Sequence, residues 1–129
     1  MKVLLDTHVF FWALVAPDRL SNAAQSAIED PASELIVSAV SAWELATKHR
    51  IGKLEAAGPI VLTYERQVAD LGAQQLSVST SHALLAGTLD WDHREPFDRL
   101  LAAQSMAEGM PLITKDSAFA TLPGIHTIW

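Results

Sequence analysis

The chain opens on a short apolar run that ends at an acidic residue, Lys2-Val3-Leu4-Leu5-Asp6. A run of this length that is apolar on both faces is typical of a strand in a buried parallel sheet. Runs of the same kind follow at residues 35–37, 112–114 and 125–129, with a weaker one at residues 76–79. We therefore predict five strands, with Asp6 at the carboxyl end of the first.

Helical patterns fill the segments between these runs. We predict helices at residues 9–15, 21–29, 40–51, 59–71, 81–89 and 96–108. Ser21 or Asn22 is expected to cap the second helix, and Pro96 to open the last. Three of the helices end at a glycine, at Gly52, Gly72 and Gly109. This alternation predicts one α/β domain over residues 1–129, with a compact, mostly parallel β-sheet flanked by α-helices.

Composition narrows the classes of function. The 129 residues carry a formal net charge of −6 and include no cysteine, which excludes disulfides and thiolate metal sites. A general nucleic-acid binder needs a basic face for phosphate contacts, and an acidic chain argues against that class. A nuclease with a carboxylate site remains compatible with this charge, because bound cations invert the local sign. An acidic surface also suits a basic protein partner.

The apolar run at residues 9–16 does not have the form of a signal peptide. Polar residues Asp6 to His8 precede it, and Pro17 stands where cleavage would be needed. No segment approaches the roughly 20 apolar residues of a membrane span. We expect a cytoplasmic protein without a membrane partner.

Two aspartates stand at the ends of predicted strands. Asp6 follows the first strand, and Asp116 follows the strand at residues 112–114. Each has a simple structural interpretation, as the cap of the helix or turn that comes next. Because α/β sheets bind ligands at the carboxyl ends of their strands, each is also a candidate metal ligand.

Two further carboxylates lie within predicted helices. Glu44 falls at the edge of an apolar stripe formed by Val40, Trp43, Thr47 and Ile51, where an inward carboxylate needs a partner or a metal. The alternative is an i, i+4 ion pair with Lys48. Asp98 lies in the first turn of its helix, where the helix dipole alone favours it and Arg94 or Arg99 could pair with it.

Taken together, the four carboxylates point to a metal site. Several carboxylates in one small site raise each other's pKa, and a hard divalent cation with oxygen ligands compensates them. Mg²⁺ is the usual choice beside phosphates. The five histidines show no HExxH spacing, and the chain has no glycine-rich phosphate loop, GxSxG elbow or cysteine nucleophile.

Four segments, taken in order, resemble the PIN-domain ribonucleases, and among them the VapC-type toxins. The first is Leu5-Asp6-Thr7-His8 followed by Phe11-Trp12, and the second is SAVSAWELA at residues 38–46, running on to Gly52-Lys53-Leu54. The third is HREPFDRLL at residues 93–101, followed by Ala103-Gln104, and the fourth is LITKD at residues 112–116. Each segment is weak alone, but their order and spacing over the whole chain are specific. Glu95 departs from the aspartate expected there, at a position outside the acidic set.

The resemblance implies a PIN-like fold and a metal-dependent endoribonuclease, the toxin component of a type II toxin–antitoxin system. The catalytic, metal-binding residues carry over onto Asp6, Glu44, Asp98 and Asp116, and supporting polar positions onto Thr7 and Thr114. Mg²⁺ is the implied cofactor, with Mn²⁺ able to replace it. A metal-activated water is expected to attack phosphorus in line, which leaves a 5′-phosphate and a 3′-hydroxyl.

Substrate and partner residues complete the hypothesis. Lys48, Arg94 and Arg99 are expected to bind the RNA backbone, whereas Arg50 and Lys53 are expected to be solvated surface charges. The resemblance also implies a VapB-like cognate antitoxin, a homodimer and a larger complex with the antitoxin. Aromatic residues are candidates for either interface or core, with core expected for most of them: Phe10, Phe11, Trp12 and Trp43.

Other classes remain as alternatives. A PIN-like RNA- or protein-binding module without catalysis would have lost its acidic set, yet all four positions are filled. A haloacid-dehalogenase-like phosphatase needs a second aspartate where His8 stands. A receiver needs an acidic pair after its first strand, where only Asp6 is present. A nuclease directed at DNA is chemically possible, because a metal site does not itself read the 2′-hydroxyl.

Overall fold

A computed structural model describes all residues, 1–129. Its centre is a five-stranded sheet in the order β3-β2-β1-β4-β5. Every neighbouring pair of strands is parallel. The strands are β1 (Lys2–Leu5), β2 (Glu34–Ser38), β3 (Gln74–Leu76), β4 (Leu112–Ile113) and β5 (Thr127–Ile128). The α/β class with a parallel sheet flanked by helices is therefore confirmed.

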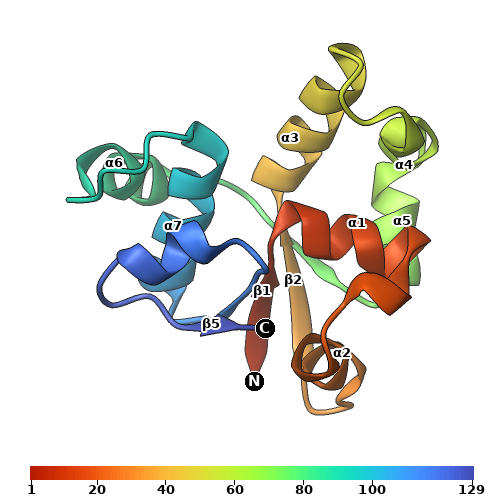
Figure 1. The fold of residues 1–129 in the computed structure, drawn as a ribbon, viewed down its shortest axis with the longest axis horizontal. Helices are drawn as coiled ribbons and strands as arrows, with labels where there is room; N and C mark the ends of the chain where they lie inside the picture. Colours follow the sequence, from red (N-terminus) through yellow and green to blue (C-terminus); the bar gives the residue numbers. More distant parts are fainter.

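Seven α-helices and three short 3₁₀ turns connect the strands. The helices are α1 (Thr7–Val15), α2 (Asn22–Glu29), α3 (Ala39–Arg50), α4 (Gly58–Leu62), α5 (Tyr64–Asp70), α6 (Thr80–Thr88) and α7 (Pro96–Glu108). The 3₁₀ turns are η1 (Pro17–Arg19), η2 (Glu55–Ala57) and η3 (Ser117–Thr121). In Figure 1, α1, α2, α4 and α5 lie on one side of β1 and β2, and α6 and α7 lie on the other. None of these helices combines the length and the apolar character needed to cross a bilayer.

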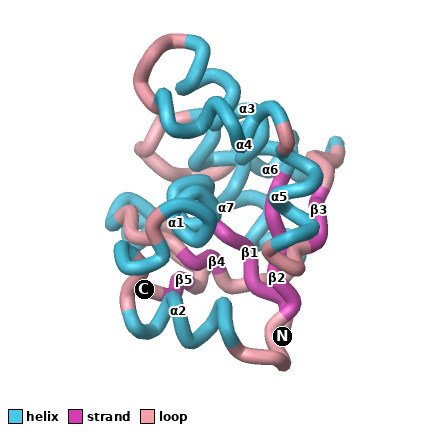
Figure 2. The backbone as a smooth tube through the Cα atoms, turned by 90° about the vertical axis from the view of Figure 1, so that its right-hand side faces the viewer, coloured by secondary structure: helices cyan, strands magenta, loops and turns pink.

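Both faces of the sheet are buried, as the apolar strand sequences predict. Successive side chains of a strand point to opposite faces. Accordingly, Val3 and Leu5 belong to one buried cluster with Phe10 of α1, whereas Leu4 belongs to a second cluster with Leu101 of α7. Figure 2 shows the strands enclosed between helices, with the N-terminus at the end of the molecule away from α3.

The strand order places a topological switch point between β1 and β4. From β1 the chain proceeds to β2 and β3 on one side, and then returns to build β4 and β5 on the other side of β1. Open α/β sheets bind ligands outside the carboxyl ends of the strands at such a point. Leu5 pairs with Ile113 there, so the residues after these two strands lie next to each other.

Most predicted element bounds are confirmed to within two residues, and those of β1 and α7 are the predicted ones. The helix predicted at residues 9–15 begins at Thr7, because Asp6 caps it by accepting a hydrogen bond from the Thr7 amide. The cap of α2 is Ser21, whose side chain accepts from the Ala24 amide. The strand at the chain end is shorter than residues 125–129, with only Thr127–Ile128 paired.

Two predictions of secondary structure were wrong. The single helix predicted at residues 59–71 is broken into α4 and α5 at Thr63, where φ is −127° and ψ is 32°. The hydroxyl of Thr63 donates to the Pro59 carbonyl, a side-chain bond that competes with helix continuation. The weak strand expected at residues 76–79 lies earlier, as β3, because β3 is an edge strand with the exposed polar side chains of Gln74 and Gln75.

Candidate active site

Asp6 is held at the switch point by hydrogen bonds to both of its carboxylate oxygens. Its Oδ1 accepts from the Thr7 amide at 2.7 Å, and its Oδ2 accepts from Thr114 Oγ1 at 2.6 Å. The residue is 6% exposed. Burial raises the pKa of this carboxyl; the Thr114 bond lowers it and the nearby Glu44 charge raises it. The side chain therefore caps α1 and also faces the crevice between β1 and β4. Burying its charged form there costs free energy.

The two threonines expected to support the site contact their neighbours directly. Thr114 joins the two strand-end aspartates, because its Oγ1 donates to Asp6 and also accepts from the Asp116 amide at 3.0 Å. Thr7 shares a hydrogen bond of 2.9 Å with Ser41 Oγ. Thr7 lies on α1 and Ser41 on α3, so this bond ties the helix that Asp6 caps to the helix that carries Glu44.

Glu44 points inward, as the sequence predicts, and it also makes the alternative ion pair. Its Oε2 accepts from Lys48 Nζ at 2.5 Å. Its Oε1 is buried and has no hydrogen-bond partner. A buried carboxylate oxygen without a partner is costly, and one lysine does not satisfy it. Glu44 therefore retains a free ligand atom inside the molecule.

Two of the four residues predicted to form the buried stripe of α3 are exposed. Trp43 is 53% exposed and Ile51 is 48% exposed. The buried face of α3 instead carries Val40, Ser41, Glu44 and Leu45. Trp43 lies edge-on to Phe97 of α7, with ring centroids 4.5 Å apart. Of the other aromatics considered for the core, Phe10 and Phe11 are buried and Trp12 is half-buried.

Asp98 is paired with a histidine and not with an arginine. His93 Nε2 lies 2.7 Å from Asp98 Oδ2, in the first turn of α7. Burial raises the pKa of Asp98 to about 7, assisted by the charges of Glu95, Asp6 and Asp116, while the His93 bond lowers it. Neither of the arginines proposed as partners from the sequence pairs with this carboxylate.

Arg99 has a structural role in the loop before α7. Its guanidinium donates to four backbone carbonyl oxygens at 2.8–2.9 Å, those of Ala86, Leu89, Trp91 and His93. These bonds use four of its five N–H groups, so the expected contact of Arg99 with RNA has no structural support. Arg94 is exposed and does not line the pocket described below, which leaves Lys48 as the one predicted substrate residue there.

Asp116 is the exposed member of the acidic set. Its Oδ1 accepts from the Ala118 amide at 2.9 Å, so the residue caps η3 as the simple interpretation predicts. The backbone amide of Asp116 donates to Thr114 Oγ1. This arrangement fixes the backbone of Asp116 beside Asp6 and leaves its second carboxylate oxygen open to solvent.

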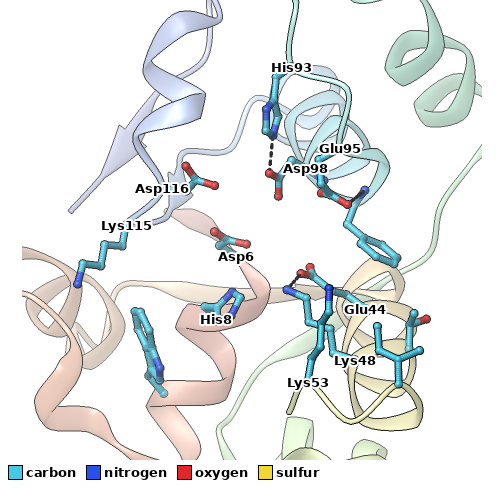
Figure 3. A pocket seen from close by; sticks show the side chains of 14 residues that line it. Asp6, His8, Glu44, Lys48, Lys53, His93, Glu95, Asp98, Lys115 and Asp116 are labelled. Atoms are coloured by element: carbon cyan, nitrogen blue, oxygen red, sulfur yellow. Dashed lines mark hydrogen bonds and ion pairs between the residues drawn. The ribbon is translucent and has the colours of Figure 1, made fainter.

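One pocket of about 670 Å³ brings all four predicted carboxylates together. Figure 3 shows Asp6, Asp98 and Asp116 directed into a common space, with Glu44 reaching toward it from α3. The carboxylates are not already assembled around an ion position: no three acidic or histidine side chains are arranged so that they could hold a metal ion. The structure thus supplies a pocket with four carboxylates but not a finished coordination sphere.

Several residues of the pocket were not predicted from the sequence. His93 and Glu95 stand beside Asp98, and Lys53 and Lys115 line the pocket as cations. Glu95 caps α7, because its Oε2 accepts from the Asp98 amide at 2.7 Å. Lys53 was expected to be a solvated surface charge; it is exposed, and it also lines this pocket. The signal available in the sequence was that all four residues lie within the segments that resemble the PIN domain.

The fold and the site define a family. The family model of the PIN domain matches residues 3–125, and the chain belongs to the PIN domain family. The chain is 39% identical to Ribonuclease VapC22 of Mycobacterium tuberculosis over 98% of both chains. Ribonucleases of this family generally depend on a divalent metal ion, which agrees with a pocket that offers carboxylate oxygens.

Solved structures of toxin–antitoxin complexes share the fold at low sequence identity. VapBC2 from Rickettsia felis, bound to a promoter DNA fragment, has a chain with a TM-score of 0.72 and 14% identity, covering 98% of this chain and 97% of that one. DNA-bound VapBC from Salmonella typhimurium gives a TM-score of 0.70 at 16% identity, over 98% and 96% of the two chains. VapBC-5 from Mycobacterium tuberculosis gives a TM-score of 0.64 at 21% identity, covering 97% of this chain and 93% of that one.

Proposed function

We propose that this chain is a metal-dependent endoribonuclease, a hydrolase of RNA phosphodiester bonds, and the toxin component of a type II toxin–antitoxin system. The observation that carries the proposal is the convergence of four carboxylates in one pocket at the switch point: Asp6, Glu44, Asp98 and Asp116. The relationship to Ribonuclease VapC22 supports the same reaction class. We further propose that residues 1–129 form a single PIN domain.

The donor atoms fit a hard divalent cation. Burial and mutual repulsion raise the pKa of both Asp6 and Asp98, and Glu44 Oε1 is buried without a partner. A cation relieves each of these costs at once, and carboxylate oxygens are the ligands of Mg²⁺. We assign Asp6, Asp98 and Asp116 as the residues that hold Mg²⁺, with Glu44 completing the set directly or through water. Mn²⁺ can replace it, because it accepts the same oxygen ligands.

When bound, the cation lowers the pKa of a water molecule and neutralises charge that develops on the phosphoryl oxygens. The protein's own residues prepare the site for it. Thr114 and the Thr7 amide fix both oxygens of Asp6, and His93 fixes one oxygen of Asp98. Lys48 offsets the charge of Glu44 and lines the pocket, where we assign it to the RNA backbone. Fixed donors of this kind reduce the reorganisation needed at the moment of reaction.

Cleavage of RNA by the isolated chain tests the proposal. We expect cutting with Mg²⁺ or Mn²⁺, none with EDTA, and none by Asp6→Asn, with products that carry a 5′-phosphate and a 3′-hydroxyl. Asp70→Asn is the matched control, since Asp70 is an exposed aspartate of α5 outside the pocket. A 2′,3′-cyclic phosphate product would contradict the water-attack route, because it requires attack by the RNA's own 2′-hydroxyl. If no metal supports cutting while RNA still binds, the chain is a binding module.

The partner proposal rests on the related complexes and on charge. The similar solved structures are VapBC toxin–antitoxin complexes, and this chain has a net charge of −6. We propose a VapB-like antitoxin as the cognate partner, a homodimer of this chain, and a larger complex with the antitoxin. Light scattering of the isolated chain tests the dimer. Loss of RNA cleavage on addition of the antitoxin, with recovery when it is degraded, tests the pairing.

A further inference from the structure

At the edge of the pocket, an indole and two cations form a cluster: Trp12 and Lys115 line the pocket, and Arg19 lies outside its lining. The Arg19 guanidinium carbon lies 5.9 Å from the centroid of the Trp12 ring, and Lys115 Nζ lies 5.8 Å from it. Trp12 belongs to α1, Arg19 to η1, and Lys115 to the segment between β4 and η3. The consecutive elements α1 and η1 and the distant segment after β4 thus place two positive charges around one aromatic ring.

Neither cation is used to neutralise a carboxylate. The chain has 9 lysines and arginines against 15 aspartates and glutamates, so opposite charges are abundant. The ion pairs of the molecule nevertheless involve neither Arg19 nor Lys115, and both side chains are exposed. Attraction to the face of an indole holds a cation in place without cancelling its charge. The pair therefore remains available to an anion from outside.

The position of the cluster relates it to the acidic pocket. Trp12 and Lys115 line the same pocket as Asp6 and Asp116. Figure 3 shows Lys115 on one side of Asp6 and Lys53, on the segment after α3, on the other. A nucleic-acid strand that places one phosphate at the carboxylates must place the flanking phosphates at the edge of the pocket. The pocket carboxylates repel these flanking phosphates, so cations are needed at the rim of the pocket to bind them.

We propose that Arg19, Trp12 and Lys115 form a backbone-phosphate subsite for single-stranded RNA at the rim of the active site. Arg19 and Lys115 bind phosphates that flank the scissile one, and Trp12 is a positioning residue that keeps the two cations together. The proposal rests on the proposed ribonuclease function and deepens it, because it states how the strand enters. RNA suits the subsite better than an acidic peptide, since its phosphates recur at every nucleotide and can occupy rim and centre together.

The salt dependence of binding tests the subsite directly. The probe is a short fluorescent oligouridylate, its affinity for the intact chain measured by anisotropy in EDTA over a series of KCl concentrations. On single strands the slope of log K against log salt changes by about 0.7 for each phosphate contact. We expect Arg19→Gln and Lys115→Gln each to reduce the slope by about 0.7, and the double variant by about twice that. Arg19→Lys and Lys115→Arg should keep the wild-type slope.

Two further variants separate positioning from folding. Trp12→Leu keeps both charges and an apolar side chain, and we expect about a two- to five-fold loss of affinity that Trp12→Phe restores in part. Arg66→Gln removes an exposed cation on α5, away from the pocket, and is the matched control with an unchanged slope. Circular dichroism of every variant confirms the fold before binding is compared.

The outcomes also distinguish this proposal from the function on which it rests. If Arg19→Gln and Lys115→Gln match Arg66→Gln in slope and affinity, the subsite is wrong, whatever the wild type cleaves. If polyglutamate competes as well as the oligonucleotide does, the cluster is an anion patch for acidic protein and the RNA assignment is overturned. If the slopes change as expected but the wild type cuts no RNA with any metal, the subsite stands and the ribonuclease proposal fails.

Discussion

Thr114 Oγ1 donates a 2.6 Å hydrogen bond to Asp6 Oδ2 and so joins residues that lie 108 positions apart. The bond crosses from the end of β4 to the end of β1, the two strands on either side of the switch point. Both residues are buried, which shields the bond from bulk solvent. It fixes the orientation of the carboxylate on which the proposed chemistry depends.

Thr114→Val keeps the shape of the side chain and removes this donor. We expect a loss of about 1–3 kcal/mol in the free energy of unfolding, because a buried carboxylate oxygen loses its partner. The pKa of Asp6 should rise further, since the Thr114 bond lowers it. Urea denaturation at neutral pH without metal measures the loss, and Thr114→Ser should recover most of it. Equal stability of the valine and serine variants would show that the bond contributes nothing.

Asp98 should make the stability of the metal-free protein depend on pH. Its pKa is about 7 in the folded chain, against about 3.9 for an unfolded aspartate. Between these values the folded state binds more protons than the unfolded state, so the free energy of unfolding falls as pH rises from about 4 to about 7. Thermal melts in EDTA across this range measure the effect, and Asp98→Asn should flatten the curve. A wild-type curve that rises over the same range would have the wrong sign.

Magnesium should stabilise the fold, and the gain should grow with the logarithm of its concentration above the Kd. A ligand that binds only the folded state raises the free energy of unfolding by about 2.7 kcal/mol at one hundred times its Kd. Metal ions bind deprotonated carboxylates, so the stabilisation should be larger above pH 7 than at pH 5. Thermal melts with increasing Mg²⁺ measure it, with Asp70→Asn behaving as wild type. If Asp6→Asn gains as much stability as wild type, the ion binds somewhere other than this pocket.

Arg99 should matter for folding more than for RNA binding. Arg99→Gln leaves carbonyl groups of the loop before α7 without their donor, and we expect a loss of about 2–4 kcal/mol in stability. Arg99→Lys should not restore it, because a lysine lacks the planar fork that reaches several carbonyls. Arg94→Gln, an exposed neighbour, is the control and should change stability by less than about 0.5 kcal/mol. A stable Arg99→Gln protein with weakened RNA binding would instead favour the contact expected from the sequence.

The sequence was most informative where function depends on the end of a strand. An apolar run followed by an acid predicts both a buried parallel strand and the place of its last residue, so Asp6 and Asp116 could be located without coordinates. Glu44 could be placed inward from helical periodicity. The partner of Asp98 could not be predicted from the sequence. The position of that partner, His93, depends on a loop whose shape is set by the Arg99 guanidinium.

Exposure was harder to predict than position. Trp43 has the residue type of a core side chain, yet it lies on the outer face of α3 against Phe97. Helical periodicity gives the spacing of a face, but which of two neighbouring faces is buried depends on the packing of α7 and the sheet. The break at Thr63 has a similar origin, since a single side-chain hydrogen bond to Pro59 decides it.

The parallel order of the sheet also has a consequence for biosynthesis. Domains begin to fold from the N-terminus while the ribosome is still at work. Here β1 and β2 can pair early, but Asp6 meets Thr114 and Asp116 only after β4 has been made. An incomplete chain therefore carries separate fragments of the acidic pocket and no working site. The pocket can therefore form only after β4 has left the ribosome and inserted beside β1.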